Sequence, residues 1–323
     1  MTYIGIDLGG TKIAAAAVDI ATGALRGRVI WPTEAHEGPD AVLARMARLV
    51  REVCARADVR LSDLAAIGVG VPGLFELETG RTLFLPNLAG AWRGVPVGET
   101  LRREAGCPVW LINDARAFVL AEATFGAGSG ARTVVGLTLG TGIGGGIAFD
   151  GRLHLGLDGT AGECGHQTID PHGPPCGCGN RGCLEAHASG PAITAMGVRA
   201  VVQGVTTSIG ALAGHDLNRI TPEVIRRAAE EGDAVAAEIL ERAGTALGVG
   251  ISNLITLLSP DRVVLGGSVA RLGEWLLRPV RAEVQRRCHV TPLERVQIVT
   301  AALEDPGIVG AAVWASQQRR AER

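Results

Sequence analysis

Four side chains in the middle of the chain are suited to holding a metal ion: His166, Cys176, Cys178 and Cys183, spaced H-x9-C-x-C-x4-C. Glycines between the cysteines provide the turns that can bring the sulfurs around one ion. Four nitrogen and sulfur ligands suit tetrahedral Zn²⁺, and a site whose four positions are all filled by protein is structural rather than catalytic. We therefore predict a structural Zn²⁺ site; reduced cysteines in a loop without metal are the alternative.

A second motif, D-L-G-G-T-K at residues 7–12, lies between two predicted strands and is suited to binding a nucleotide. Gly9 and Gly10 expose backbone N–H groups and let a phosphate approach closely. Thr11 and Lys12 can add donors. Asp7 can orient a hydrated Mg²⁺. The context fits neither a Walker A loop nor a Rossmann fingerprint, and a simple Gly-Gly hairpin is the alternative.

A glycine-rich segment, residues 140–146, takes the corresponding place in the second half of the chain. Five glycines within seven residues weaken strands, so close approach of the backbone to a ligand explains them better than a flexible loop. The two hairpins together would clamp a nucleotide, and small residues around Gly267 could admit its adenine and ribose. We therefore predict ATP with Mg²⁺ as cofactor, with phosphate contacts in this segment from Gly140, Thr141, Gly142, Gly144 and Gly145.

The hydrophobic pattern that must position these groups is that of an α/β protein. It predicts strands at 3–7, 12–19, 28–31, 65–71 and 109–112, with helices at 39–57 and 115–125. Asn113 and Asp114 follow the last of these strands, and ligands of open α/β sheets bind at such carboxyl ends. From residue 133 the order of strand, glycine-rich turn and strand recurs, with strands at 133–139, 147–150, 262–265 and 296–301 and helices at 222–231, 233–258, 273–287 and 307–318. The chain is therefore expected to be duplicated.

Length and composition restrict the class of protein further. A chain of 323 residues exceeds what one core usually supports, so two lobes with a cleft between them are expected. A net charge of -2 gives no support for nucleic-acid binding, and the apolar runs are too short to span a membrane. Seven cysteines, three of them close together, fit a reducing compartment better than a disulfide framework, and no secretion signal is recognised. We expect a cytoplasmic protein without nucleic-acid or membrane partners.

Taken together, these motifs resemble those of the ROK family (repressors, uncharacterised reading frames and sugar kinases), from Tyr3 to about Val313. The family motifs are D-x-G-G-T-K at 7–12, a second phosphate loop at 139–146, E-x-G-H at 163–166, C-x-C-G-x-x-G-C-x-E at 176–185 and a last helix with 307–312. The resemblance implies a two-lobed actin-like ATPase (ribonuclease H-like) fold, with duplicated mixed β-sheets and a central cleft. It places the small lobe at 1–113 with the C-terminal helix 304–323, and the large lobe at 114–303 with the zinc loop at 163–185.

The resemblance also implies an ATP-dependent sugar kinase that works as a homodimer or homotetramer. In this family pattern Asp114 is the general base for the attacking sugar hydroxyl, and Gly73 lets the backbone approach the sugar. The ring hydroxyls are held by Asn113, Glu163, His166 and Glu185, with His166 also a zinc ligand. The alternatives are a helix N-cap for Asp114 and a solvated or zinc-loop carboxylate for either glutamate.

Two departures from the family glucokinases concern the substrate. Ile112 precedes Asn113, and Arg116 follows Ala115, where those enzymes commonly read Glu-Asn-Asp-Ala-Asn. The apolar residue and the segment 170–174 look more like N-acetylmannosamine kinases, whereas Glu163 is what glucokinases show. We expect glucose as substrate, with an N-acetylmannosamine or N-acetylglucosamine kinase and a non-catalytic sugar sensor as alternatives. Family repressors carry a winged helix-turn-helix before the first motif, which here follows Met1 and Thr2 closely, so a kinase is favoured.

Overall fold

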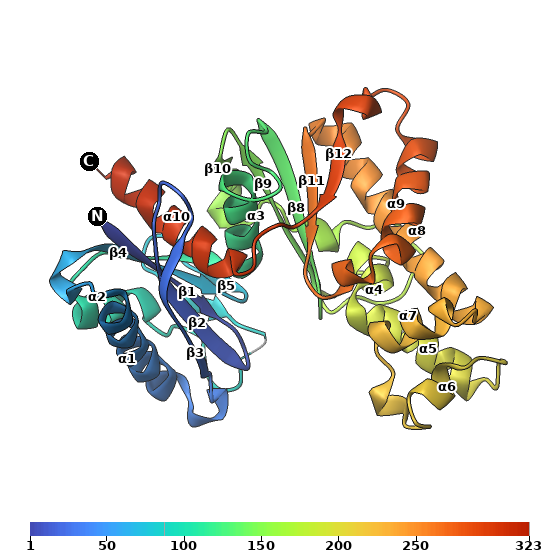
Figure 1. Cartoon of the computed structure of the whole chain (residues 1–323), viewed down its shortest axis with the longest axis horizontal. Coiled ribbons are helices and arrows are strands. Elements are labelled where there is room, and N and C mark those ends of the chain that lie inside the picture. The colour runs from blue at the N-terminus through green and yellow to red at the C-terminus, as the bar shows by residue number, and fades with distance from the viewer. Residues whose placement is uncertain (87, 323) are drawn as a thin grey trace. The chain divides into compact units, whose positions relative to one another are not determined.

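The computed structural model describes residues 1–86 and 88–322 and contains two compact units (Figure 1). The first unit comprises Met1–Gly130, Gly151–Ala161 and Ala302–Arg323, and the second comprises Ala131–Asp150 and Gly162–Ala301. These boundaries differ from the predicted ones, because residues 114–130 and 151–161 belong to the first unit rather than to the predicted 114–303 lobe. The reason is packing: α3 (Asp114–Thr124) shares a hydrophobic cluster with α10 (Pro306–Ala321).

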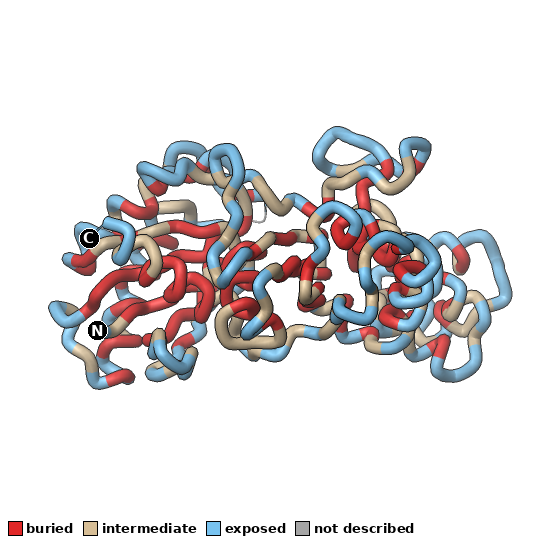
Figure 2. Tube along the Cα trace, turned by 90° about the horizontal axis from the view of Figure 1, so that it is seen from above, coloured by how far each residue is buried: buried red, intermediate tan, exposed pale blue. Residues whose placement is uncertain are grey.

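The first unit is built on a mixed five-stranded sheet of order β3-β2-β1-β4-β7. Its strands are β1 (Thr2–Leu8), β2 (Lys12–Val18), β3 (Leu25–Pro32), β4 (Leu64–Val71) and β7 (Val109–Asn113). β1 to β3 form an antiparallel meander, while β4 and β7 add in parallel beside β1. Side chains alternate between the faces: Ile4 and Ile6 pack with α1 (Pro39–Ala57) and α2 (Val97–Ala105), whereas Tyr3 packs with α10. β1, β2 and β4 are accordingly buried on both faces, whereas the edge strand β3 is partly exposed; Figure 2 shows the burial along the chain.

The second unit repeats this arrangement with strands in the order β9-β8-β11-β12. Here β8 (Thr133–Leu139) and β9 (Ile143–Phe149) form the antiparallel hairpin, and β11 (Arg262–Gly266) and β12 (Gln297–Thr300) add in parallel. A large cluster of buried apolar side chains joins this sheet to α8 (Ala234–Leu258) and α9 (Glu274–Arg287). The remaining helices are α4 (Leu184–Ala188), α5 (Gly190–Val202), α6 (Ile209–Leu212) and α7 (Pro222–Glu230). The predicted α/β class with two mixed sheets is confirmed.

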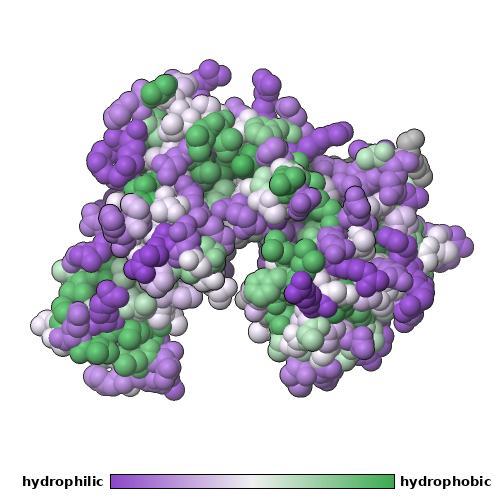
Figure 3. All heavy atoms as spheres, turned by 180° about the vertical axis from the view of Figure 1, so that it is seen from behind, coloured by the Kyte–Doolittle hydropathy of each residue, from purple (hydrophilic) through white to green (hydrophobic). Residues whose placement is uncertain are grey.

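Short elements complete the first unit. β5 (Leu74–Phe75) and β6 (Thr82–Phe84) pair as a small hairpin after Gly73, and β10 (Arg152–Leu153) follows residue 151. The hairpin exposes apolar side chains, with Phe84 61% exposed. Figure 3 shows that hydrophobic residues also lie among the hydrophilic ones on the face it displays. Among the described residues, no helix is both long enough and apolar enough to cross a membrane.

Close packing of α10 on the first sheet depends on two glycines. A Cβ atom at Gly5 of β1 would lie 1.9 Å from the Ile308 carbonyl oxygen, and one at Gly68 of β4 would lie 1.7 Å from the Ala311 carbonyl oxygen. Both distances are far below van der Waals contact. Glycine therefore allows the helix backbone to lie directly against the strands at these two points.

We predict that Gly68→Ala destabilises the first unit by ~1–3 kcal/mol or more, since the new methyl group must displace the α10 backbone. Gly70→Ala is the matched control in the same strand, because a Cβ there would meet its nearest atom at an ordinary 3.5 Å. Urea unfolding monitored by circular dichroism measures both variants. Equal midpoints for the two variants would contradict the packing argument.

Candidate functional site

Asp7 lies near the carboxyl end of β1, where the first predicted phosphate hairpin begins. Burial and the nearby charge of Asp114 raise the pKa of Asp7 to about 6, although Lys12 acts to lower it. The first turn of α10 lies against the carboxylate, since a Cβ at Gly307 would be 2.7 Å from Oδ2 of Asp7. The structure thus brings Asp7 and Asp114 together and leaves their negative charge only partly compensated by Lys12. A cation is the natural partner for such a pair.

The hairpin after Asp7 is stabilised by hydrogen bonds within the turn and from Thr33. Gly9 N donates to the Lys12 carbonyl at 2.9 Å and closes the turn, while Oγ1 of Thr33 donates to the Gly9 carbonyl at 2.6 Å. Thr33 N also donates to the Thr11 carbonyl at 2.9 Å. Gly10 is half-buried at the turn, and Thr11 and Lys12 are exposed. The carbonyl groups of the turn are therefore held by hydrogen bonds. This arrangement is suited to binding an anion at the tip of the turn through backbone N–H groups.

Asn113 and Asp114 stand where β7 ends and α3 begins. Oδ1 of Asn113 accepts hydrogen bonds from the backbone N–H groups of Ala115 (3.0 Å) and Arg116 (3.2 Å), so Asn113 is the N-cap of α3. Its Nδ2 donates to the Gly73 carbonyl at 3.3 Å, which joins two of the predicted sugar contacts. Asp114 is the first residue of the helix. The capping role considered for Asp114 belongs to Asn113, although Oδ1 of Asp114 also accepts from Ala115 N at 2.8 Å.

The glycine at position 73 has a local explanation. Its φ is 135°, and a Cβ there would lie 2.2 Å from the Phe84 carbonyl oxygen of the β5–β6 hairpin. A side chain is excluded by both conditions. Gly73 is therefore required by the turn itself, and its carbonyl is oriented toward the Asn113 amide.

In the second unit, three segments meet around the turn between β8 and β9. Gly140 N donates to the Gly142 carbonyl at 2.9 Å, and the Gly140 carbonyl accepts from Gly190 N at 2.8 Å. Gly267 has φ 88°, and a Cβ there would lie 2.3 Å from the Leu139 carbonyl oxygen. The predicted phosphate turn and the predicted adenosine segment are thus neighbours. They lie beside the N-terminus of α5, a helix of 13 residues whose N-cap is Ser189.

The sequence analysis did not include that helix in the site. Its start was signalled by Ser189 two positions before Pro191, a capping residue followed by proline in the first turn. Residues 190–202 were not assigned to a helix because Gly190, Pro191 and Gly197 interrupt the apolar pattern. Thr33, which fixes the first hairpin, was also missed, since nothing in a lone threonine marks such a role.

The second glycine-rich turn is shorter than predicted. The expected turn at 140–146 ends at Gly142, because β9 begins at Ile143 and pairs with β8 through Gly144, Gly145 and Gly146. A Cβ at Gly145 would lie 2.9 Å from Sγ of Cys164 and from the Gly162 carbonyl oxygen. Glycine at 145 is therefore explained by packing of the strand against the 162–164 segment, without reference to a ligand.

His166, Cys176, Cys178 and Cys183 form one cluster, whose candidate ligand atoms all lie within 4.8 Å of one another. Nδ1 of His166 is 3.6 Å from Sγ of Cys176, and the sulfurs of Cys178 and Cys183 are 3.7 Å apart. A zinc tetrahedron with Zn–S bonds of ~2.3 Å has edges of roughly 3.8 Å between sulfurs. Burial raises the pKa of Cys183 to about 12 and so disfavours its thiolate form. A bound cation would lower this pKa, because it stabilises the thiolate. The donor set and its spacing therefore fit Zn²⁺.

Glu185 connects this cluster to the phosphate turn. Its Oε2 accepts a hydrogen bond from Ile143 N at 2.8 Å, at the start of β9, and its Oε1 is 3.8 Å from Sγ of Cys176. A Cβ at Gly142 would lie 2.5 Å from Oε2. Glu163 lies at the other end of the loop, exposed, with its carbonyl accepting from His166 N at 3.0 Å. The second unit thus gathers Glu185, the four candidate ligands and the phosphate turn, with Glu163 three residues before His166.

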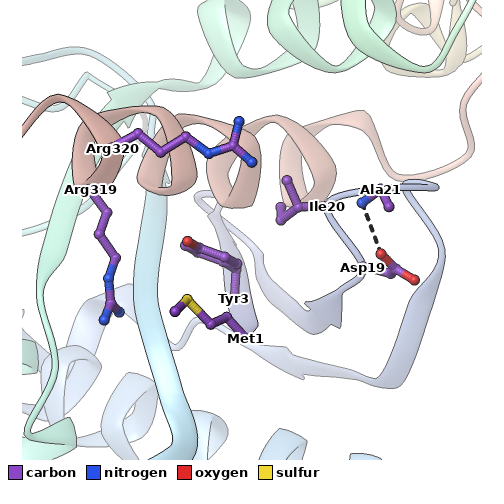
Figure 4. Close-up of a pocket in the computed structure, with 7 residues that line it drawn as sticks. All are labelled: Met1, Tyr3, Asp19, Ile20, Ala21, Arg319 and Arg320. Atoms are coloured by element: carbon purple, nitrogen blue, oxygen red, sulfur yellow. Dashed lines mark hydrogen bonds between the residues drawn. The ribbon is translucent and has the colours of Figure 1, made fainter. Parts of the chain in front are cut away.

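A cavity of 270 Å³ in the first unit lies apart from these residues and is lined by Met1, Tyr3, Asp19, Ile20, Ala21, Arg319 and Arg320. Figure 4 shows that the guanidinium groups of Arg319 and Arg320 extend in different directions. The carboxylate of Asp19 accepts from Ala21 N at 2.8 Å. The two cations do not converge on one position, so the candidate site remains with the predicted residues.

Comparison with known proteins gives matches over nearly the whole chain. The ROK family model matches residues 3–318. A glucokinase of Thermotoga maritima is 37% identical over 313 residues, 97% of this chain and 96% of the relative. A ROK hexokinase structure from Thermus thermophilus has a TM-score of 0.83 at 33% identity, covering 99% of this chain and 100% of that one. A ROK family glucokinase from Streptomyces griseus, in complex with glucose and AMPPNP, has a TM-score of 0.81 at 33% identity, covering 98% and 100%.

The raised pKa of Asp7 leads to a prediction about stability and pH. An unfolded aspartate has a pKa of 3.8, whereas Asp7 in the folded protein has a pKa of about 6. As the pH rises through this interval, ionisation of Asp7 therefore lowers the free energy of unfolding, by about 3 kcal/mol in all. Without Mg²⁺, Asp7→Asn should therefore be more stable than the wild type at pH 7.5. The difference should shrink as the pH is lowered to 5.

Guanidinium unfolding at a series of pH values measures this difference. Asp58→Asn is the control, because Asp58 is exposed at the end of α1. A stability difference for Asp7→Asn that is the same at pH 5 and pH 7.5 would show that the Asp7 charge is not the cause.

Proposed function

The chain belongs to the ROK family, and we propose that it is an ATP-dependent sugar kinase that phosphorylates a hexose, with glucose as its substrate. The observation that carries the proposal is the pair of carboxylates in the first unit. Asp114 begins α3 with the capping role taken by Asn113, and its charge acts on the half-buried Asp7 beside a glycine hairpin. This provides an acceptor for a hydroxyl proton next to a candidate metal and phosphate position.

Phosphoryl transfer requires positioning and charge stabilisation more than covalent participation of the protein. In the proposed mechanism Asp114 accepts the proton of the attacking sugar hydroxyl. Asp7 orients the hydrated Mg²⁺, which when bound neutralises charge on the phosphates. Backbone N–H groups of the hairpin at residues 9–12, with the Lys12 ammonium, contact the phosphates from the first unit. Gly140, Thr141, Gly142 and Gly144, together with Gly267, contact the nucleotide from the second.

The sugar hydroxyls are assigned to residues from both units. Asn113 at the end of β7 and Gly73 after β4 are joined by a hydrogen bond, and each of them offers a polar group to the sugar. Glu163, His166 and Glu185 are the partners from the second unit. The presence of Glu163, together with the glucokinase relatives, favours glucose over an N-acetylated amino sugar. Homodimer or homotetramer assembly and a cytoplasmic location stay predictions.

We further propose that His166, Cys176, Cys178 and Cys183 hold a structural Zn²⁺. Nδ1 of His166 faces the sulfur of Cys176, which leaves Nε2 for the sugar. The proximity of Cys176 to Glu185 ties the metal to a second proposed sugar ligand. With all four positions supplied by side chains, the metal orders the loop and takes no part in the phosphoryl transfer.

The proposed activity is tested with a panel of hexoses and N-acetylhexosamines, with ATP and then polyphosphate as donor, by coupled ADP release and by sugar phosphate detection. Glucose with ATP should be preferred. Asp114→Asn should keep sugar and nucleotide binding but lower kcat by at least ~10²-fold, the lower range for loss of a general base.

Asp58→Asn, at an exposed position of the first unit, is the control for substituting an aspartate. If the enzyme preferred N-acetylmannosamine, the proposed substrate would change but the proposed kinase activity would stand. Absence of transfer to every sugar would favour the sugar sensor. Near-normal turnover of Asp114→Asn would refute its role as base.

The zinc proposal predicts the behaviour of Cys178→Ala. Cys178 is exposed, so this change removes little packing, and any large effect must come from loss of the metal. We expect loss of stoichiometric zinc, lower stability of the second unit and weakened or abolished sugar phosphorylation, while the hairpin at residues 7–12 stays folded. Metal analysis, sugar titration and hydrogen exchange measure these effects.

Cys54→Ala is the matched control, since Cys54 lies in the core of the first unit and should keep the metal. No zinc in the wild-type protein, or full sugar affinity in Cys178→Ala without zinc, would overturn the proposal.

A further inference from the structure

The chain passes between the two units four times, at 130/131, 150/151, 161/162 and 301/302. We call these four points the chain crossings. Within the first unit, side chains of α3 and α10 bind the backbone beside three of them. Two of these side chains are buried charged groups on α3, the helix that begins with Asp114.

Arg116 binds the crossing at 161/162. Its side chain is buried, with the residue only 4% exposed. Both Nε (3.1 Å) and Nη2 (2.9 Å) donate to the carbonyl oxygen of Ala161, the last residue of the first unit before the zinc loop. Two charge-assisted hydrogen bonds to one oxygen fix its direction as well as its position. Ala161 also lies two residues before Glu163 in the chain, so this contact fixes the start of a segment that holds a proposed sugar ligand.

Glu122 binds the crossing at 301/302. The residue is fully buried, and its carboxylate accepts hydrogen bonds from Leu303 N at 2.9 Å and from Ala302 N at 3.1 Å. The same carboxylate accepts from Ala127 N at 2.8 Å, in the segment that leads to the crossing at 130/131. A buried carboxylate needs such partners, because it cannot be left unpaired without a large penalty. One side chain therefore holds the approach to two crossings.

Both anchors are rigidly connected to the candidate base. α3 has 11 residues, with Asp114 first, Arg116 in its first turn and Glu122 near its end. Its N-terminus is capped by Asn113, and its side packs directly on α10, where a Cβ at Gly310 would lie 1.8 Å from the Ala117 carbonyl oxygen. A displacement of a crossing segment is therefore transmitted through a helix, rather than through a loop, to the residue at its first position.

We propose that Arg116 and Glu122 are positioning residues that couple the chain crossings to the placement of Asp114. This inference rests on the proposed kinase function. In it, Arg116 acts through the Ala161 carbonyl and Glu122 through the Ala302 and Leu303 amides. Neither residue touches the substrates. Their role is to hold the base-bearing helix in register with the segments that lead into the second unit, where errors of ~1 Å can lower a rate by ~10²-fold.

The test uses the full-length protein with bound metal and the sugar that it phosphorylates best. Arg116→Met keeps an unbranched apolar stem and removes both donors, and should lower kcat by ~10-fold or more with changes below ~3-fold in the KM of sugar and ATP. Arg116→Lys and Arg116→Gln each retain one donor toward Ala161 and should recover part of kcat. If Arg116→Met does not fold, these two variants carry the test, with kcat below wild type at nearly unchanged KM.

Gln317→Met is the matched control. Nε2 of Gln317 donates to the Gly151 carbonyl at 2.9 Å, the same kind of contact at the crossing 150/151, but from α10, which carries no base. Its kcat should stay within ~2-fold of wild type even where its melting temperature falls. Thermal melts of all variants separate loss of folded protein from loss of rate.

Three results would overturn the inference: wild-type kcat in Arg116→Met, an equal kcat loss in Gln317→Met, or a raised KM at unchanged kcat. Glu122→Gln, which keeps one acceptor oxygen, should show a smaller kcat loss with the same pattern, and unchanged kcat there would remove Glu122 from the proposal. Absence of sugar phosphorylation by the wild type would instead reject the proposed function itself, before any variant is compared.

Discussion

The first unit holds two carboxylates, Asp7 and Asp114, so close that the charge of one opposes ionisation of the other. Burial opposes the ionisation of Asp7 more strongly still, and Lys12 relieves only part of this opposition. A fold selected for stability alone would avoid such a pair, because each charge that is not matched lowers the stability of the native state. In the proposed function, this arrangement becomes favourable when a divalent cation and its phosphates bind beside the two carboxylates. The rest of the unit can be understood as the framework that keeps the pair in place.

That framework relies on backbone-to-backbone contact between α10 and the first sheet. Gly5 and Gly68 let the helix lie against β1 and β4, and Gly307 and Gly310 let it approach Asp7 and α3. The helix start therefore reaches the Asp7 carboxylate, and the positive end of its dipole faces that charge. α3 packs on this helix, and the helix is in turn joined to β7 because Trp314 Nε1 donates to the Leu111 carbonyl at 2.8 Å. Small residues at four points thus determine where both acids stand.

The amino-acid sequence was a good guide wherever spacing alone carried the information. Period-two and continuous apolar runs located nearly all the strands of both sheets, and the four metal-ligand candidates chosen from their spacing converge in one cluster. The start of β9 was misplaced, since glycines 144 to 146 were taken as a turn although they pair with β8. α5 was missed for a related reason, as its small residues pack in the interior. Capping by Asn113 rather than Asp114 depends on backbone geometry that adjacent polar residues do not distinguish.

Glu185 shows why site residues cannot be assigned from motifs one at a time. Its place in the family motif, two residues after Cys183, implies a sugar ligand, yet one of its oxygens accepts from Ile143 N at the predicted phosphate turn and the other lies beside a candidate zinc ligand. A carboxylate with these partners has its orientation fixed before any substrate binds, which reduces the entropy lost on binding. The glycine at 142 is then needed to make room for Glu185 itself. The proposed metal loop, the proposed phosphate turn and the proposed sugar ligand are consequently parts of one packed structure, so a change in one of them should affect the other two.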